Sequence, residues 1–197
     1  GGVVGNKGLL GDEDPLNKYY AYGIRNSFGL DFDPVTSDIW DTENGVDDND
    51  EINLVIPGFN SGWKQVMGIA PEAFDPQNFV NFGGNGVYSD PEFVWKQTVG
   101  PTDLKFLNSN KLGSKYENTI FIGDFNNGYI YNFKLNPART GLQLEGELSD
   151  RTADTPDEEE NIIFGEGFGV ITDIEVGPDG YLYILGYDGT IYRIISG

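Results

Sequence analysis

The densest group of side chains capable of chemistry lies in the stretch ENGVDDNDE, residues 43–51. Its carboxylates would repel one another unless a positive charge lies among them, so a divalent cation at this turn is one interpretation. Calcium suits it, because calcium takes about six to eight oxygen ligands. The spacing excludes an EF-hand loop, which needs Gly at its sixth position and Glu at its twelfth. The alternative is an acidic loop that is only solvated.

Arg25 and Asn26 form a second candidate pair, directly before an apolar alternating run. An arginine there can give an anionic ligand a fixed positive charge and paired hydrogen-bond donors, and both effects strengthen when water is excluded. The structural alternative is that Arg25 pairs with a nearby carboxylate. Aromatic residues such as Tyr131 and Phe133 offer a surface for stacking sugar rings, but their alternation along a strand favours core packing.

Composition excludes several classes of function. The chain has no Cys, so disulfides, thiolate chemistry and Cys-type zinc sites are excluded. It also has no His, so a histidine general base is excluded. Lys and Arg number 12 against 32 Asp and Glu, and the resulting net charge of -20 would repel nucleic acid and anionic membrane surfaces. No apolar run approaches the roughly 18 residues of a membrane span, so no membrane insertion is expected.

The elements that position these residues are strands. Phe28, Leu30 and Phe32 alternate with small or polar residues, and Ile52, Leu54 and Ile56 follow the same period beyond the acidic turn. This is the period of half-buried strands. We therefore expect two strands joined by residues 43–51, and we expect that acidic stretch itself not to be a strand.

The pattern repeats along the chain. Leu30-x-Phe32, Leu104-x-Phe106 and Ile174-x-Val176 lie about seventy residues apart. Repeated antiparallel units of about four strands predict blades of a β-propeller rather than a sandwich. We predict one all-β domain, residues 1–197, with about three four-stranded antiparallel blades at approximately 19–63, 92–148 and 162–197. Because propellers close with about four to eight blades, a missing N-terminal half or a second copy of the chain would have to complete the ring.

Four motifs carry a resemblance to a known family: IRNSFGLDFDP, DTENG, DEINLV and PGFNSGW, in this order. Weaker similarity continues through TVGPT, FIGDFNNGYIYNF and ITDIEVGPDGYLYIL. The chain resembles the C-terminal half of the soluble sugar dehydrogenases of the glucose/sorbosone dehydrogenase family, which use pyrroloquinoline quinone (PQQ). The resemblance implies a six-bladed β-propeller, an extracellular or periplasmic location, and a sugar substrate. The implied reaction oxidises an aldose at C1 to the lactone with calcium-bound PQQ.

The resemblance also implies roles for individual residues. The Arg-Asn pair contacts the quinone, two backbone carbonyls hold the calcium ion that polarises it, and a Glu with a later carbonyl binds a second, structural calcium. The expected cofactor contacts are Arg25, Asn26, Asn44 and Thr98, and the expected metal ligands are Gly45, Val46, Asp50, Glu51 and Ser61. Asn44, Val46 and Ser61 differ from the usual family residues, although the carbonyls at Val46 and Ser61 remain.

Other family positions have lost their function in this sequence. The family's catalytic His belongs to the N-terminal half, and this chain contains none. The family has a Lys that binds the quinone where this chain has Asn126, and it has two Arg where this chain has Val170 and Thr172. These losses predict that PQQ binding is weaker, absent or served by other residues. The competing hypothesis is a non-catalytic secreted propeller, a calcium-stabilised binding or surface module.

Overall fold

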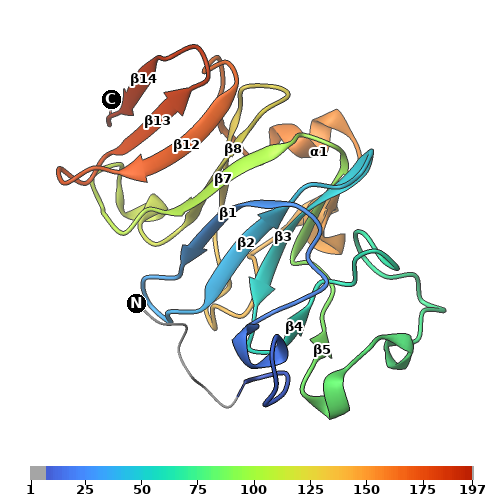
Figure 1. Ribbon diagram of the computed structural model, residues 1–197. Helices are drawn as coiled ribbons and strands as arrows, with labels where there is room; N and C mark the ends of the chain where they lie inside the picture. The colour runs from blue at the N-terminus through green and yellow to red at the C-terminus, as the bar shows by residue number, and fades with distance from the viewer. Residues whose placement is uncertain (1–7, 197) are drawn as a thin grey trace.

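The computed structural model describes residues 8–196, which form an all-β fold built from three successive sheets (Figure 1). The first sheet has the strand order β1-β2-β3-β6-β10, in which the first four strands are antiparallel and β10 pairs parallel with β6. Its strands are β1 (Ser27–Phe32), β2 (Ile39–Glu43), β3 (Asp48–Val55), β6 (Phe93–Gln97) and β10 (Thr152–Ala153). The all-β, four-stranded antiparallel prediction is confirmed for the first and second sheets.

The second and third sheets follow along the chain. The second sheet has the order β11-β9-β8-β7, and the third has the order β12-β13-β14. Their strands are β7 (Pro101–Phe106), β8 (Ile120–Asp124), β9 (Ile130–Phe133), β11 (Ile163–Gly165), β12 (Ile171–Val176), β13 (Leu182–Gly186) and β14 (Ile191–Ile194). The short strands β4 (Phe59–Asn60) and β5 (Val87–Tyr88) pair with each other in parallel.

Helical segments are short and lie in the connections. The α-helix is α1 (Pro156–Glu160), and the 3₁₀ turns are η1 (Leu16–Lys18), η2 (Pro76–Asn78), η3 (Phe82–Gly84), η4 (Ser114–Tyr116) and η5 (Gly146–Asp150). Within residues 8–196, no helix is long and apolar enough to cross a membrane.

Two features differ from the expected strand arrangement. The sequence grouped Phe93–Lys96 with the second unit and residue 162 onward with the third, yet β6 pairs with β3 and β11 pairs with β9. Each outer strand therefore returns to its own sheet after a long insert. The acidic stretch 43–51 was also expected not to be a strand, but Glu43 ends β2 and residues 48–51 begin β3. Only residues 44–47 connect the two strands, so the prediction was wrong at both ends.

The apolar core lies between the sheets. One cluster joins the first and second sheets through large side chains such as Trp40, Trp95 and Tyr131, and a second joins the second and third sheets through Phe121 and Ile174. Burying such side chains stabilises the stack by roughly 1.5–3 kcal/mol each. Tyr131 is fully buried, which confirms core packing over sugar stacking at that position.

The inner strands β1, β7 and β12 lie side by side and are joined by carboxylates (Figure 1). Asp31 on β1 accepts a hydrogen bond from the backbone N–H of Phe106 at 2.9 Å. Asp103 on β7 accepts one from the backbone N–H of Ile174 at 2.6 Å. A carboxylate of the first sheet thus binds a backbone N–H at the edge of the second, and a carboxylate of the second binds one at the edge of the third. These bonds fix the position of neighbouring sheets along the direction of the strands.

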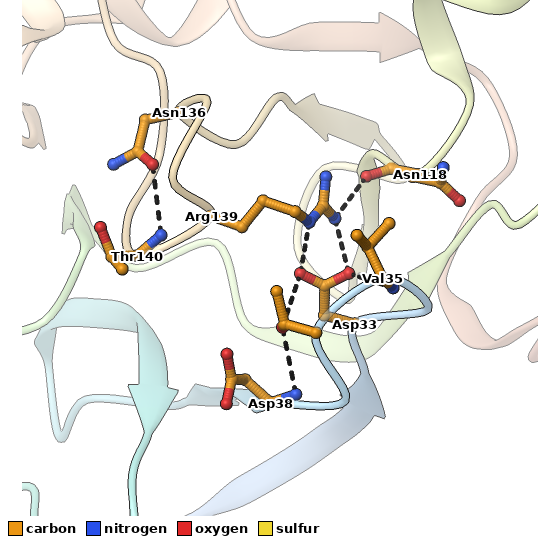
Figure 2. Close-up of polar contacts among 8 residues, drawn as sticks. Asp33, Val35, Asp38, Asn118, Asn136, Arg139 and Thr140 are labelled. Carbon is orange, nitrogen blue, oxygen red and sulfur yellow. Dashed lines mark hydrogen bonds and ion pairs between the residues drawn. The ribbon is translucent and has the colours of Figure 1, made fainter.

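A buried ion pair locks the first sheet to the second (Figure 2). Asp33 lies in the turn between β1 and β2, and Arg139 lies in the loop after β9. The guanidinium binds the carboxylate with two bonds, Nε to Oδ2 at 2.5 Å and Nη2 to Oδ1 at 2.7 Å. Nη2 also donates to the carbonyl of Asn118 at 2.9 Å, so the arginine spans three segments.

Candidate functional site

The predicted site residues gather at one rim of the sheets. This rim is where β1 begins, β2 ends, β3 begins and β6 ends, because Ser27 pairs with Glu43 and Asp48 pairs with Gln97. The connections that follow, residues 44–47 and 98–100, lie at the same rim. The turn after β8 joins them, since Pro101 pairs with Asp124.

Arg25 holds the acidic turn through its carbonyls rather than through an ion pair. Its Nη1 donates to the carbonyls of Asn44 at 2.5 Å and Gly45 at 2.8 Å. Its backbone N–H donates to Glu43 Oε2 at 2.7 Å, and its guanidinium carbon lies 5.4 Å from the centre of the Trp63 ring. Among the described residues, the guanidinium forms no ion pair with a carboxylate, so charge remains available for an anion at this rim.

Sequence reasoning missed Trp63 as a partner of Arg25. It lies in the PGFNSGW motif, and its backbone N–H binds the carbonyl of Gly23 at 2.9 Å, which carries the indole to the rim. Arginine over an indole face is a cation–π contact that also orients the guanidinium plane. The PGFNSGW motif was the only sequence signal that pointed to Trp63. The spacing between Arg25 and Trp63 gives no indication that the two side chains meet.

Asn26 and the turn residues complete this part of the rim. Asn26 is exposed, and its carbonyl accepts the N–H of Asn44 at 3.0 Å. The side-chain Oδ1 of Asn44 is buried without a hydrogen-bond partner among the described residues. Gly45 is buried and Val46 is exposed. A Cβ at residue 45 would collide with the carbonyl of Asp48, so only glycine fits this turn.

Asp50 is fully buried and has a different environment from the one expected of a metal ligand. Its Oδ1 accepts the N–H of Gly45 at 2.7 Å. Its Oδ2 accepts three donors at 2.7 Å each, namely the hydroxyl of Thr98 and the N–H groups of Val99 and Gly100. The structure therefore brings Asp50 together with Gly45 and Thr98, and fills its carboxylate with protein donors.

Glu51 lies on the opposite face of β3, within a buried acidic cluster of Asp41, Glu43, Glu51 and Asn53. Asn53 Nδ2 donates to Glu43 Oε1 at 3.2 Å and lies 3.4 Å from Glu51 Oε2. The insert covers this face, because the Ser61 hydroxyl lies 3.4 Å from Glu51 Oε2 and the N–H of Gly68 donates to Glu51 Oε1.

Burial controls the protonation of this cluster. Desolvation, followed by repulsion from Glu43, raises the pKa of Glu51 to about 8 and that of Asp41 to about 7. Asp41 Oδ1 and Asn53 Oδ1 are buried without partners within the described chain. Across residues 8–196, no group of three or more acidic side chains is arranged to hold a metal ion. Any cation here would therefore need backbone carbonyls among its ligands.

The remaining predicted positions lie on the second and third sheets. Thr98 and Asn126 are in contact, since Asn126 Nδ2 donates to the Thr98 carbonyl at 3.0 Å and its N–H donates to the Val99 carbonyl at 3.1 Å. Val170 precedes β12, and its carbonyl accepts the N–H of Tyr187 at 2.8 Å. The hydroxyl of Thr172 donates to the carbonyl of Leu185 at 3.0 Å. These side chains supply no cation to the rim.

A hollow of about 740 Å³ lies elsewhere, at the end of the second sheet where β9 finishes and β11 begins. Its walls include Tyr116, Lys134 and Phe164, and it contains none of the predicted site residues. Its position at the opposite rim separates it from the Arg25 site.

Comparisons with known proteins identify the family of the chain. Residues 1–193 match the family model described as Glucose / Sorbosone dehydrogenase. The aldose sugar dehydrogenase YliI of Escherichia coli K12 is 28% identical over 188 residues, covering 91% of this chain and 46% of that protein. The chain spans less than half the length of the curated relatives it matches.

Solved structures support the same assignment. A putative oxidoreductase (glucose dehydrogenase) from Thermus thermophilus is 26% identical with a TM-score of 0.61, covering 86% of this chain and 41% of that chain. The PQQ-bound aldose sugar dehydrogenase from Streptomyces coelicolor is 19% identical with a TM-score of 0.59, covering 92% of this chain and 45% of that one. The second likeness concerns the fold alone.

Proposed function

Because the chain belongs to the glucose/sorbosone dehydrogenase family, we propose that it forms part of a PQQ-dependent quinoprotein that oxidises an aldose at C1 to the lactone. The observation that carries this proposal is the Arg25 cluster at the rim. There a guanidinium, the carbonyls of Asn44 and Gly45, and the Thr98 loop meet around one turn. Bound PQQ supplies the hydride acceptor, which no amino-acid side chain can replace.

The chain's own residues would bind and orient that cofactor. Arg25 is held by two carbonyls and by Trp63, so its remaining donors have a fixed direction toward an anionic group. Asn26 is exposed beside it, and Asn44 and Thr98 lie on the adjoining loops. Such fixed donors are effective because they need no reorganisation when the ligand arrives.

Calcium would bind through backbone oxygens. The carbonyls of Gly45 and Val46 are the proposed ligands of the ion next to the quinone, and a carbonyl that accepts one hydrogen bond keeps a second lone pair. A second calcium would take Glu51 with the carbonyl of Ser61. The buried, unpartnered oxygens of Asp41 and Asn53 support a cation near that face. Asp50 does not enter either ligand set, because four donors fill its carboxylate.

The proton acceptor would come from outside this chain, which contains no His. A sugar C1 hydroxyl needs a base with a pKa near the working pH. The pKa values of Asp41 and Glu51 lie in that range, but both carboxyls are buried away from any substrate at the rim. The family's cationic positions at Asn126, Val170 and Thr172 also carry no charge here. Asn126 is occupied by Thr98, so it is not free to replace a lysine.

These losses favour the second candidate function, a non-catalytic calcium-stabilised propeller that serves as a secreted binding or surface module. Its scaffold and acidic turn would be retained while cofactor contacts were lost. Both candidates share an extracellular or periplasmic location. They differ in whether PQQ binds at all.

We also propose that the three sheets are consecutive blades of a six-bladed ring. Asp103 and Asp173 occupy matching positions after Thr and a β-bulge, but Asp103 binds the next sheet whereas Asp173 is exposed. At the other end, Phe28, Leu30 and Phe32 are each more than half exposed. The exposed apolar side chains at the first sheet and the exposed Asp173 at the third suit further blades, from a second copy or from an N-terminal half.

Titration calorimetry of PQQ into the purified chain with calcium, beside light scattering, tests the proposal. Saturable binding that a chelator abolishes, and that Arg25→Gln weakens, would support the quinoprotein function. No binding at any calcium concentration would favour the non-catalytic module. A mass near twice 21.7 kDa would support completion of the ring by a second copy, and a monomer would point to an N-terminal half.

A further inference from the structure

We infer that Asp50 is a positioning residue that clamps two rim loops to each other, and that the position of the Gly45 carbonyl depends on it. The two loops are residues 44–47, between β2 and β3, and residues 98–100, between β6 and β7. The clamp itself stands on the hydrogen bonds of this chain. Its consequence for calcium rests on the proposed function.

The Asp50 carboxylate accepts four hydrogen bonds, and both of its oxygens take part. Oδ1 faces the first loop through the N–H of Gly45, and Oδ2 faces the second loop through Thr98, Val99 and Gly100. All four donor–acceptor distances are 2.7 Å, which is short for N–H···O bonds and typical of charge-assisted ones. The carboxylate is fully buried, so no water competes with these donors.

The clamp extends to the candidate cofactor contacts on either side. On the first loop, Arg25 Nη1 donates to the carbonyls of Asn44 and Gly45. On the second loop, Asn126 donates to the carbonyls of Thr98 and Val99. A movement of either loop must therefore change the hydrogen bonds of the other, and both pass through Asp50.

A carboxylate is required at this position because both of its oxygens must accept. The amide of Asp50→Asn has one oxygen, which the three donors of the second loop would bind. The amide NH₂ would then face the N–H of Gly45, so that donor would be left buried and unpaired. The variant should release the Gly45 turn while adding no bulk.

Asp124 provides a matched control. It is fully buried, its Oδ1 accepts the N–H groups of Asn127, Gly128 and Tyr129, and its Oδ2 lies 3.0 Å from the hydroxyl oxygen of Tyr131. Like Asp50, it is fully buried and accepts three backbone N–H groups, but these belong to residues 127–129 and not to the Gly45 turn. Asp124→Asn should carry the general cost of such a substitution without touching the Gly45 turn.

Amide hydrogen exchange on the full chain measures the clamp directly. In the wild type, the amides of Gly45, Val99 and Gly100 should exchange slowly, since their hydrogen bonds end on a buried group. Asp50→Asn should accelerate exchange at least about tenfold at Gly45, and less at Val99 and Gly100, whose donors the amide oxygen retains. Asp124→Asn should accelerate exchange at residues 127–129 and leave the Gly45 amide unchanged.

Terbium luminescence, with terbium as the calcium probe, separates positioning from mere stability. Asp50→Asn should lower terbium affinity at least about tenfold relative to Asp124→Asn at equal stability in urea. Equal affinities in the two variants would overturn the claim that Asp50 positions the calcium turn. If the wild type binds no terbium, the proposed calcium site fails, and the exchange data still decide whether the clamp exists.

Hydrogen exchange at Gly45 also gives the result that would refute the inference. Unchanged exchange at Gly45 in Asp50→Asn would overturn the clamp. If Asp50→Asn does not fold, the wild type suffices: unprotected amides at Gly45 and Gly100 would refute the inference, and protection there would support it. Thr98→Val, which removes one donor from Oδ2, should then accelerate exchange at Val99 and Gly100.

Discussion

Replacing Arg139 with methionine should destabilise the fold more than any comparable loss of a surface charge. The Asp33 side chain is completely buried, and that of Arg139 is 17% exposed. Methionine keeps most of the aliphatic chain but removes both bonds to the carboxylate and the bond to the Asn118 carbonyl. Asp33 would keep only the Val35 N–H and the Thr36 hydroxyl as donors.

The size of the effect follows from this burial. Removing one partner of a buried ion pair costs about 3–5 kcal/mol, and the partial exposure of Arg139 reduces this to about 2–4 kcal/mol. A domain of this size loses about 2–4 °C of melting temperature per kcal/mol, so a fall of roughly 5–15 °C is expected. Urea unfolding of wild type and Arg139→Met at pH 7 measures the difference. Arg193→Met is the matched control, because Arg193 pairs with Asp179 at the surface and should cost no more than about 1 kcal/mol.

The pH dependence gives a second test of the same pair. Burial alone would raise the pKa of Asp33, but the bonds and charge of Arg139, with the Val35 N–H, hold it below its usual value. A carboxylate with a lowered folded pKa contributes stability above its unfolded pKa, and this contribution disappears as the pH falls through the folded pKa. The difference between wild type and Arg139→Met should therefore be large at pH 7 and shrink towards pH 3. An Arg139 variant no less stable than Arg193→Met, or a difference that persists at pH 3, would refute the reasoning.

Three further changes test the rim. Arg25→Gln should weaken PQQ binding by about tenfold or more in calorimetry, because it removes a charged donor, and unchanged affinity would exclude Arg25 as a cofactor contact. Gly45→Ala should cost at least about 2 kcal/mol in urea unfolding, since its Cβ would collide with the Asp48 carbonyl; a neutral result would contradict the turn geometry. Because burial, then Glu43, raises the pKa of Glu51 to about 8, the calcium-free chain should lose stability as the pH rises from about 5 to about 8. Glu51→Gln should flatten that loss in thermal melts, and calcium should raise the melting temperature of the wild type more than that of the variant, which loses one of the two proposed ions; an equal calcium response in both would remove Glu51 from the metal site.

The sequence predicts the third sheet well because its information is local. The strands β12, β13 and β14 alternate apolar and polar residues, and they are joined by the tight turns at residues 177–180 and 187–189. A hairpin needs only its own residues to specify register, so alternation and Gly-containing turns are sufficient.

The outer strands of the first two sheets are not local in this sense. β6 reaches β3 only after the insert at residues 56–92, and β11 reaches β9 only after residues 134–162. Sequence proximity joins each of them to the following unit, because only a few residues separate β6 from β7. The core determines the partner, because Phe93 and Trp95 on β6 pack against Phe133 and Tyr131 of the second sheet.

The acidic segment at residues 151–161 carries a local sequence signal for a helix start. Thr155-Pro156-Asp157-Glu158 is a capping box with Pro at the start of a helix, and the structure forms α1 there. Glu158 is buried in this cap, and Glu159 accepts the Tyr131 hydroxyl at 2.6 Å. A run of carboxylates predicts solvent exposure only when none of them accepts hydrogen bonds in a helix cap or from a buried hydroxyl.

The candidate metal site illustrates how a strand boundary changes a chemical conclusion. Asp50 and Glu51 look like joint ligands if they belong to a loop, because a loop can turn neighbouring side chains toward one ion. Once β3 begins at Asp48, successive side chains must point to opposite faces, so the two carboxylates cannot share a cation. Glu51 faces Glu43, its direct cross-strand neighbour, whereas Asp50 faces the loop at residues 98–100. The order Asp-Glu therefore encodes two separate tasks, a clamp for the rim on one face and a buried acidic cluster on the other.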